Sequence, residues 1–299
     1  MDDITHQPGH SALYFGETRD DWWNLDHLQL LARRWSLDRG ISAVLDVGCG
    51  IGHWSRLLAR MLPAPVFVTG VDREPGWITE ARRRSPSDIF AFVEGDALAL
   101  PFADASFDLV SCQTVLIHLA DPRRALAEMA RVLRPGGHLL LAEPNNAAST
   151  LAGLITGPDI DPTDVLRELA VVLRCLHGKI RLGLGDNSLG ESMPGLLDTA
   201  LFTSIDVAQN DRPSPLIPPY ATRAEQAAIE ERRDLLSRGV WGWSRDETRQ
   251  YYEAGGGSDF DREWAFCLAQ EAHRIALLDQ GKLALTSGQN HYILHARRR

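Results

Sequence analysis

Between residues 41 and 145, short apolar runs alternate with helical stretches, and this alternation restricts the fold more than any other feature. We interpret five runs as strands: Ala43–Val47, Val66–Asp72, Phe90–Glu94, Phe107–Cys112 and His138–Glu143. Helical patterns stand between them at His53–Arg60, Ile78–Arg84 and Pro122–Leu133. Apolar runs of this length with helices between them indicate parallel strands buried on both faces. Right-handed crossovers then predict a doubly wound α/β sheet.

The rest of the chain divides around this core, 41–145. Residues 1–40 predict an N-terminal helical segment that buries Leu28, Leu30, Leu31 and Trp35 and stops at Gly40. In 146–299 we expect a helical cap, inserted in two stretches, and the last two strands of a seven-stranded, mostly parallel sheet. Those strands are Thr203–Val207 and His291–Ala296, with a proline-rich break at Pro213–Pro219. The cap helices are expected at Val165–Leu176, 223–237, 245–253 and 259–280.

Composition limits the partners and the compartment. The 299 residues carry a net charge of −9, which disfavours a nucleic-acid partner because the phosphate backbone repels an acidic surface. No run of about 18 apolar residues is present, and the N-terminus lacks the pattern of a secretory signal. The 4 cysteines are widely spaced, and the histidines have no metal-ligand spacing. We expect a cytoplasmic protein without a membrane span, a metal site or a nucleic-acid partner.

The strand at Ala43–Val47 runs into a turn with glycine at 48, 50 and 52, followed by a helix. Glycine permits a sharp bend and lets a ligand approach the backbone closely. A dinucleotide fingerprint needs its third small residue at the position of His53, so the match to a pyrophosphate loop is poor. A tight turn without a ligand is the structural alternative.

The segment Asp46-Val47-Gly48-Cys49-Gly50-Ile51-Gly52 is similar to the first motif of class I S-adenosylmethionine-dependent methyltransferases. Four later segments, in the expected order, strengthen the resemblance: Asp72 after the second strand, Glu94-Gly95-Asp96-Ala97 after the third, Phe107–Leu119 and Arg131–Leu141. The resemblance is closest to the small-molecule branch related to ubiquinone and menaquinone methyltransferases. It implies a Rossmann-like fold and S-adenosylmethionine as the cofactor.

The resemblance also implies roles for individual residues. Asp72 would hold the ribose hydroxyls and Asp96 the adenine amino group, although Asp96 could instead be a helix N-cap. Tyr14 or Trp22 could cover the sulfonium, or could simply be buried with the N-terminal helix. The residues expected to bind the cofactor are Tyr14, Trp22, Asp46, Gly48, Cys49, Gly50, Gly52, Asp72, Arg73, Asp96, Ala97, Gln113, Val115 and His118.

Two residues are candidates for the base that removes a proton from the methyl acceptor. His118 follows the fourth strand, where ligands of such sheets bind, and its ordinary pKa suits proton transfer at neutral pH. It could instead only orient the cofactor. Glu143, at the end of the fifth strand, is the second candidate; its alternative is a carboxylate that caps a turn.

The acceptor itself is expected to be a small organic molecule, methylated on oxygen, nitrogen or carbon. Trp241, Trp243, Tyr251 and Tyr252 would either line its pocket or pack the cap against the core. Two other functions stay open. One is an NAD(P)-dependent oxidoreductase, and the other is a cofactor-binding scaffold without catalytic activity.

Overall fold

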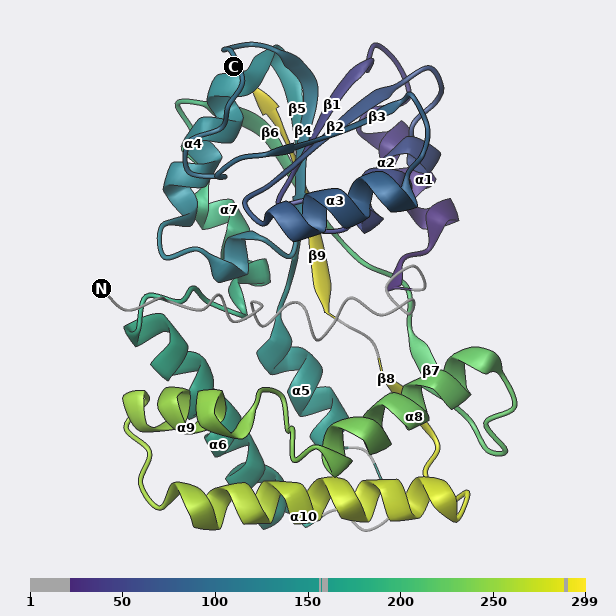
Figure 1. Ribbon diagram of the computed structural model, residues 1–299, viewed down its shortest axis with the longest axis vertical. Helices are drawn as coiled ribbons and strands as arrows, with labels where there is room; N and C mark the ends of the chain where they lie inside the picture. The colour runs from purple at the N-terminus through teal and green to yellow at the C-terminus, as the bar shows by residue number, and fades with distance from the viewer. Residues whose placement is uncertain (1–21, 156, 158–160, 288–289) are drawn as a thin grey trace.

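The computed structural model describes residues 22–155, 157, 161–287 and 290–299 and contains one seven-stranded sheet (Figure 1). The strand order is β3–β2–β1–β4–β5–β9–β6. The strands span Ala43–Val47 (β1), Phe67–Asp72 (β2), Phe90–Glu94 (β3), Phe107–Gln113 (β4), Leu133–Pro144 (β5), Phe202–Gln209 (β6) and His291–Arg298 (β9). β9 is antiparallel to both of its neighbours, while β1–β5 are parallel. The predicted fold class is confirmed.

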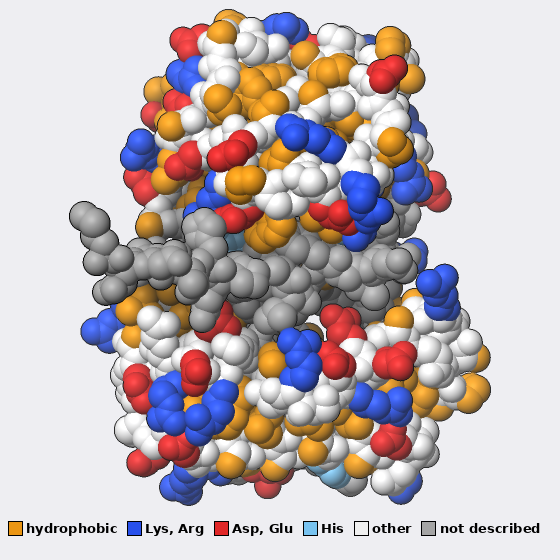
Figure 2. Space-filling view, in the orientation of Figure 1, with side chains coloured by type: hydrophobic (Ala, Val, Ile, Leu, Met, Phe, Trp, Pro, Cys, Tyr) orange, Lys and Arg blue, Asp and Glu red, His pale blue; other side chains and the backbone are white. Residues whose placement is uncertain are grey.

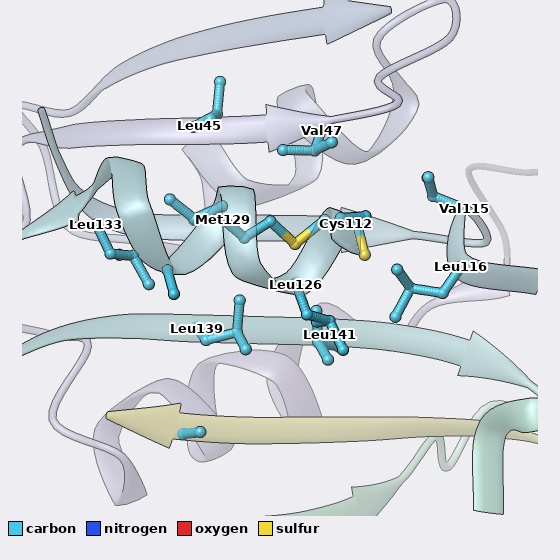
Figure 3. Packing of buried hydrophobic residues seen from close by; sticks show 14 of the residues in the cluster. Leu45, Val47, Cys112, Val115, Leu116, Leu126, Met129, Leu133, Leu139 and Leu141 are labelled. Carbon is cyan, nitrogen blue, oxygen red and sulfur yellow. The ribbon is translucent and has the colours of Figure 1, made fainter. Parts of the chain in front are cut away.

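Helices cover both faces of this sheet because successive side chains of a strand point to opposite faces. On one face, Val44 and Leu109 pack beneath α1 (Leu25–Arg34) and α2 (His53–Met61). α3 (Pro75–Arg84) packs against β2 and β3. On the other face lie α4 (Pro122–Val132) and the short α7 (Met193–Leu196). Figure 3 shows Leu126 and Met129 of α4 among Leu45, Cys112 and Leu141 of the strands.

Two details of the N-terminal helix differ from the sequence prediction. α1 ends at Arg34, six positions before Gly40, and Trp35 is its C-cap. Leu28 and Leu31 are buried as predicted, whereas Leu30 is 55% exposed. Residues 28, 31 and 32 lie on one face of the helix, as its period requires. Residue 30 lies on the opposite face and points outward.

A layer of helices lies beyond the carboxyl ends of the parallel strands, in the lower half of Figure 1. We call this layer the cap. It consists of α5 (Asn146–Leu154) and α6 (Pro162–Arg181), between β5 and β6, and of α8 (Arg223–Ser237), α9 (Arg245–Ala254) and α10 (Phe260–Asp279), between β6 and β9. The division of the chain into three sequence segments remains a prediction.

The cap also holds a two-stranded sheet that the sequence did not predict, β7 (Ser214–Leu216) paired with β8 (Leu285–Ser287). The stretch from Pro213 to Pro219 was expected to be a break. Pro215 is tolerated in β7 because both strands of a two-stranded sheet are edges, where a missing N–H is not needed.

Glycines allow the cap to pack closely on itself and on the core. A Cβ at Gly178 of α6 would lie 1.7 Å from the carbonyl oxygen of Tyr251 in α9. A Cβ at Gly185, after α6, would lie 2.2 Å from the carbonyl oxygen of Ile117 in the core. The side chains that follow α6 are therefore held beside the end of β4. None of the helices in the described ranges is both long and apolar enough to cross a bilayer.

Candidate functional site

A pocket of about 360 Å³ lies where the ends of β1, β2, β3 and β4 meet the cap. One wall comes from the core, mostly from the loops that follow these strands. We call it the core wall. The other, the cap wall, consists of Lys179, Leu184, Glu247 and Tyr251. The volume is in the range of pockets that bind cofactors and drug-sized molecules.

The glycine turn forms the floor of the core wall. Gly48, Gly50 and Gly52 have φ values of +67°, +51° and +82°, a backbone conformation that disfavours other residues. The amides of Gly48 and Cys49 donate to the carbonyl oxygen of Val71 at 2.7 and 3.0 Å, which fixes the turn to β2. A Cβ at Gly48 would lie 2.5 Å from a methyl of Val115. The turn is therefore rigid and free of side chains where a ligand would approach.

Asp72, at the end of β2, is buried at the edge of this turn with 6% of its surface exposed. Burial raises the pKa of its carboxyl group, while hydrogen bonds from the amides of Glu74 and Gly50 lower it. Those amides donate to Oδ1 at 3.0 Å and to Oδ2 at 2.9 Å. A carboxylate has about four acceptor positions, so Asp72 retains capacity for two hydroxyl donors.

Asp96 and Ala97 follow β3 and line the same pocket. Asp96 Oδ1 accepts a hydrogen bond from the amide of Leu98 at 2.8 Å, and a bridge joins Asp96 to Ala99. The segment is therefore a tight turn, and the alternative of a helix N-cap for Asp96 is wrong. The turn therefore brings both Asp96 and Ala97 to the pocket surface.

Two residues predicted to contact the cofactor lie beneath the pocket instead of lining it. Asp46 is 1% exposed, and its Oδ2 accepts a hydrogen bond from Ser55 Oγ at 2.5 Å. Burial raises the pKa of Asp46 to about 7, against the lowering effect of that hydrogen bond. Gly52 is the N-cap of α2. Asp46 supports the glycine turn from below, because a strand residue next to a covering helix is shielded from the sheet edge. Gly52 is the end of the turn, where the chain enters α2.

Glu143 was a candidate base, and the structure corrects this expectation. Its side chain is 0% exposed and is not part of the pocket surface. Its Oε1 accepts hydrogen bonds from the amides of Val115 and Leu116, both at 2.9 Å. Burial raises the pKa of Glu143 to about 7, and the hydrogen bonds with these amides oppose the rise. Glu143 therefore positions the turn that carries His118.

His118 ends the short 3-10 helix Leu116–His118 and lines the pocket. It therefore lies on the core wall, next to the loop that Gly185 packs against. The pocket brings together most of the residues predicted from the sequence, namely Gly48, Cys49, Gly50, Asp72, Arg73, Asp96, Ala97, Gln113, Val115 and His118.

Of the two aromatic residues predicted to cover the sulfonium, the structure describes only Trp22, which does not line this pocket. Tyr14 lies outside the described residues. Trp22 lines a smaller neighbouring pocket of about 120 Å³, which shares His53, Trp54 and Gln113 with the main one. The centroid of the Trp22 ring lies 5.9 Å from that of His291, the first residue of β9.

Sequence reasoning missed most of the cap wall. Of the four cap aromatics, only Tyr251 reaches the pocket; Trp241, Trp243 and Tyr252 belong to the cluster between α6, α9 and α10. Lys179, Leu184 and Glu247 were not predicted at all. One signal was available: Lys179 is one of only two lysines, with Lys282, among the 31 basic residues.

Comparisons with known proteins identify the core. Residues 45–141 match the family described as "Methyltransferase domain". The chain contains a class I S-adenosylmethionine-dependent methyltransferase domain. The family resemblance read from the sequence is confirmed, and the cofactor of such a domain is S-adenosylmethionine. The turn at 48–52, the carboxylate of Asp72 and the 96–97 turn fit a nucleoside with a short polar chain.

Two curated methyltransferases are similar to part of this chain. A demethylmenaquinone methyltransferase of Deinococcus radiodurans is 42% identical over 114 residues, 38% of this chain and 47% of that protein. A phthiotriol/phenolphthiotriol dimycocerosates methyltransferase of Mycobacterium tuberculosis is 37% identical over 169 residues, 55% of this chain and 59% of that protein. Among solved structures, the YcgJ protein of Bacillus subtilis is 18% identical with a TM-score of 0.49, covering 92% of this chain and 99% of that one.

The chain spans less than half the length of the first four curated relatives that it matches, at 30%, 37%, 47% and 40%. The relatives therefore identify the methyltransferase domain. They leave the reaction and the acceptor of the whole protein to be argued from its own pocket.

Proposed function

We propose that this protein transfers a methyl group from S-adenosylmethionine to a small organic acceptor. The observation that carries the proposal is the joint position of Asp72, the glycine turn and the Asp96–Ala97 turn in one pocket. A carboxylate at the end of β2 suits the two ribose hydroxyls, and the 96–97 turn offers an acceptor and a donor to the adenine. The cap wall then faces the part of the pocket left for the acceptor.

The charge of the pocket favours a sulfonium cofactor over a dinucleotide. Asp72, Glu74 and Asp96 all line the core wall. Glu74 is paired with Arg73 of the same wall at 3.5 Å. Among the described residues, the carboxyl groups of Asp72 and Asp96 have no such ion pair, and they attract a sulfonium cation and repel a diphosphate. In addition, His53 occupies the position at which a dinucleotide loop needs its third small residue. These features argue against the NAD(P)-dependent oxidoreductase considered from the sequence.

The chain's residues then have distinct tasks. Asp72 would accept hydrogen bonds from the ribose hydroxyls, and Asp96 from the adenine amino group. The backbone of residues 48–50 would lie beside the amino-acid part of the cofactor. The bound cofactor supplies an electrophilic methyl group, so the protein has to orient the acceptor and exclude water. His118, which lines the pocket, would accept a proton from the acceptor. Glu143 accepts hydrogen bonds from the backbone of the turn that carries His118.

The surface gives no reason to add a nucleic-acid partner. On the face that Figure 2 shows, basic and acidic side chains are interspersed over both the sheet half and the cap half. A mixed surface on a chain with a net charge of −9 does not attract a phosphate backbone. As part of the proposal, the protein acts in the cytoplasm, where its 4 free and buried cysteines would stay reduced.

Isothermal titration calorimetry with S-adenosylhomocysteine and with NADH tests the proposal. We expect S-adenosylhomocysteine to bind and NADH to show no heat beyond dilution. Binding of NADH alone would overturn the proposal. Tight binding of S-adenosylhomocysteine without methyl transfer to any member of a broad acceptor panel would favour the non-catalytic scaffold.

A further inference from the structure

Lys179 is a buried ammonium group on the cap wall. The residue lies on α6, lines the pocket, and is only 4% exposed. The chain uses lysine twice among 31 basic residues, and the other lysine, Lys282, is exposed in the turn after α10. A long cationic side chain is rarely buried unless it is paired. The groups that surround Lys179 therefore indicate its role.

Those partners leave the charge of Lys179 without a direct counter-ion. Its Nζ donates a hydrogen bond to Asn187 Oδ1, a neutral amide. In the part of the chain that the structure describes, no carboxylate oxygen lies within 4.0 Å of that nitrogen. An ammonium has three donors, and the described residues accept one of them. Because Lys179 lines the pocket, a ligand bound there could accept another.

The nearest carboxylates are occupied elsewhere. Glu247 of α9 accepts hydrogen bonds from the amide and the hydroxyl of Ser244, at 3.1 and 2.6 Å, as part of a capping box. Asp186, after α6, accepts from the amide of Ser188 at 2.8 Å. Both act on Lys179 only through space. Tyr251 of α9 lines the same pocket from the cap. The titratable groups that line it from the core are Cys49, His53, Asp72, Arg73, Glu74, Asp96 and His118.

The balance of these effects sets the protonation of the amine. Burial lowers the pKa of Lys179 to about 8, and the charges of Asp186 and Glu247 oppose the decrease. At neutral pH the ammonium is therefore the main form, and an anion bound beside it would raise its pKa. A buried cation without a direct ion pair is costly, and an anionic ligand would remove that cost.

We propose that Lys179 recognises the methyl acceptor, and that the acceptor is a small molecule with a weakly acidic hydroxyl group, a phenol or an enol, held as its oxyanion. This rests on the proposed function. The hydroxyl proton passes to His118 or to solvent, and an oxygen lone pair forms the new O–CH3 bond. The electron pair of the broken S–CH3 bond stays on sulfur. Lys179 contacts the oxyanion, and Leu184 and Tyr251 flank it with apolar surface.

The first test uses 4-nitrophenol, whose phenolate absorbs visible light, in the presence of S-adenosylhomocysteine. With the wild-type protein, we expect the apparent pKa of the bound phenol to fall by about one unit or more, as next to a cation. Lys179→Met should abolish the shift, Lys179→Arg should restore part of it, and the surface control Lys282→Met should behave like the wild type. Affinity for S-adenosylhomocysteine should be the same in all four proteins.

The second test needs no variant. Trace acetylation with acetic anhydride, followed by mass spectrometry of the two lysine peptides, gives the pH at which each amine becomes reactive. We expect Lys179 to titrate near pH 8, and 4-nitrophenol to protect Lys179 from acetylation while leaving the exposed Lys282 unprotected.

Four results would overturn the proposal. They are an unchanged phenol shift in a folded Lys179→Met protein, equal protection of both lysines by 4-nitrophenol, no binding of 4-nitrophenol by a wild type that binds S-adenosylhomocysteine, and loss of S-adenosylhomocysteine affinity in Lys179→Met. The last would assign Lys179 to the cofactor's carboxylate. A wild-type protein that binds no S-adenosylhomocysteine would instead refute the proposed function on which this inference rests.

Discussion

The core wall and the cap wall of the pocket are built in different ways. The core wall comes from loops that follow consecutive parallel strands, and much of it is backbone: a glycine turn, two amides bonded to Val71, and the 96–97 turn. The cap wall consists of side chains from α6, the loop after it, and α9. The first wall suits a cofactor that is the same in every reaction of this class. The second suits an acceptor that differs from one enzyme to the next.

A substitution at the contact between α6 and α9 should destabilise the cap wall more than any other change proposed below. In Gly178→Ala the new methyl group would collide with the carbonyl oxygen of Tyr251, 1.7 Å away, so the helices must separate. We expect a loss of about 3 kcal/mol in unfolding free energy, the upper end for overpacking, measured by urea denaturation.

Gly153→Ala in α5 is the matched control, because a Cβ there meets nothing within 4 Å. It should leave stability unchanged or raise it by up to about 1 kcal/mol through helix propensity. If the walls are independent, Gly178→Ala retains affinity for S-adenosylhomocysteine while losing 4-nitrophenol binding. Loss of both affinities together would show that the two walls form one unit.

His118 belongs to the core wall but is expected to serve the acceptor. His118→Ala should lower turnover of phenolic acceptors by about a hundredfold, within the range for loss of a general base. Affinity for S-adenosylhomocysteine, measured by calorimetry, should change less than threefold. If affinity falls as much as turnover, His118 orients the cofactor, which was the alternative considered from the sequence.

Asp72 tests the core wall alone. Asp72→Ala should weaken binding of S-adenosylhomocysteine at least tenfold, because a hydrogen bond with a charged group contributes about 1.5–3 kcal/mol. Asp88→Ala, an exposed acid between α3 and β3, is the control and should bind like the wild type. An unchanged affinity in Asp72→Ala would remove this residue from the site.

A smaller effect on the unfolding free energy is expected from Asp46, the carboxyl group beneath the core wall. Because the pKa of Asp46 is raised to about 7, the folded protein holds this proton more tightly than the unfolded chain does. Its contribution to stability is therefore greatest below its ordinary pKa and decreases as pH rises toward 7, by at most about 1.4 kcal/mol per pH unit.

Unfolding free energies of the wild type and Asp46→Asn at pH 5, 6 and 7 measure this contribution. We expect the wild type to lose more stability over this range than the variant, in which the group cannot ionise. Glu143 titrates in both proteins and cancels in the comparison. Parallel pH profiles would mean that Asp46 is ionised throughout.

The core wall could be predicted from the sequence to a much greater extent than the cap wall. Asp72 and Gly48 could be located because short segments after buried strands must meet at one sheet edge. The sequence does not show which residues are buried beneath that edge. Asp46 and Glu143 were therefore expected to contact the cofactor or the acceptor, whereas Asp46 bonds to a side chain of α2 and Glu143 to backbone amides. Lys179 could not be located, because its place depends on the crossing of α6 and α9, two helices far apart in the chain. The exposure of Leu30 was missed because the sequence spacing did not show which side of the helix faces the sheet.

A crystal structure with bound S-adenosylhomocysteine would test the division into a cofactor wall and an acceptor wall most directly. We predict that the ribose hydroxyls contact Asp72, that the adenine lies against Asp96 and Ala97, and that the sulfur faces the space between His118 and Lys179. A nucleoside bound anywhere else, or a cofactor carboxylate paired with Lys179, would contradict the account.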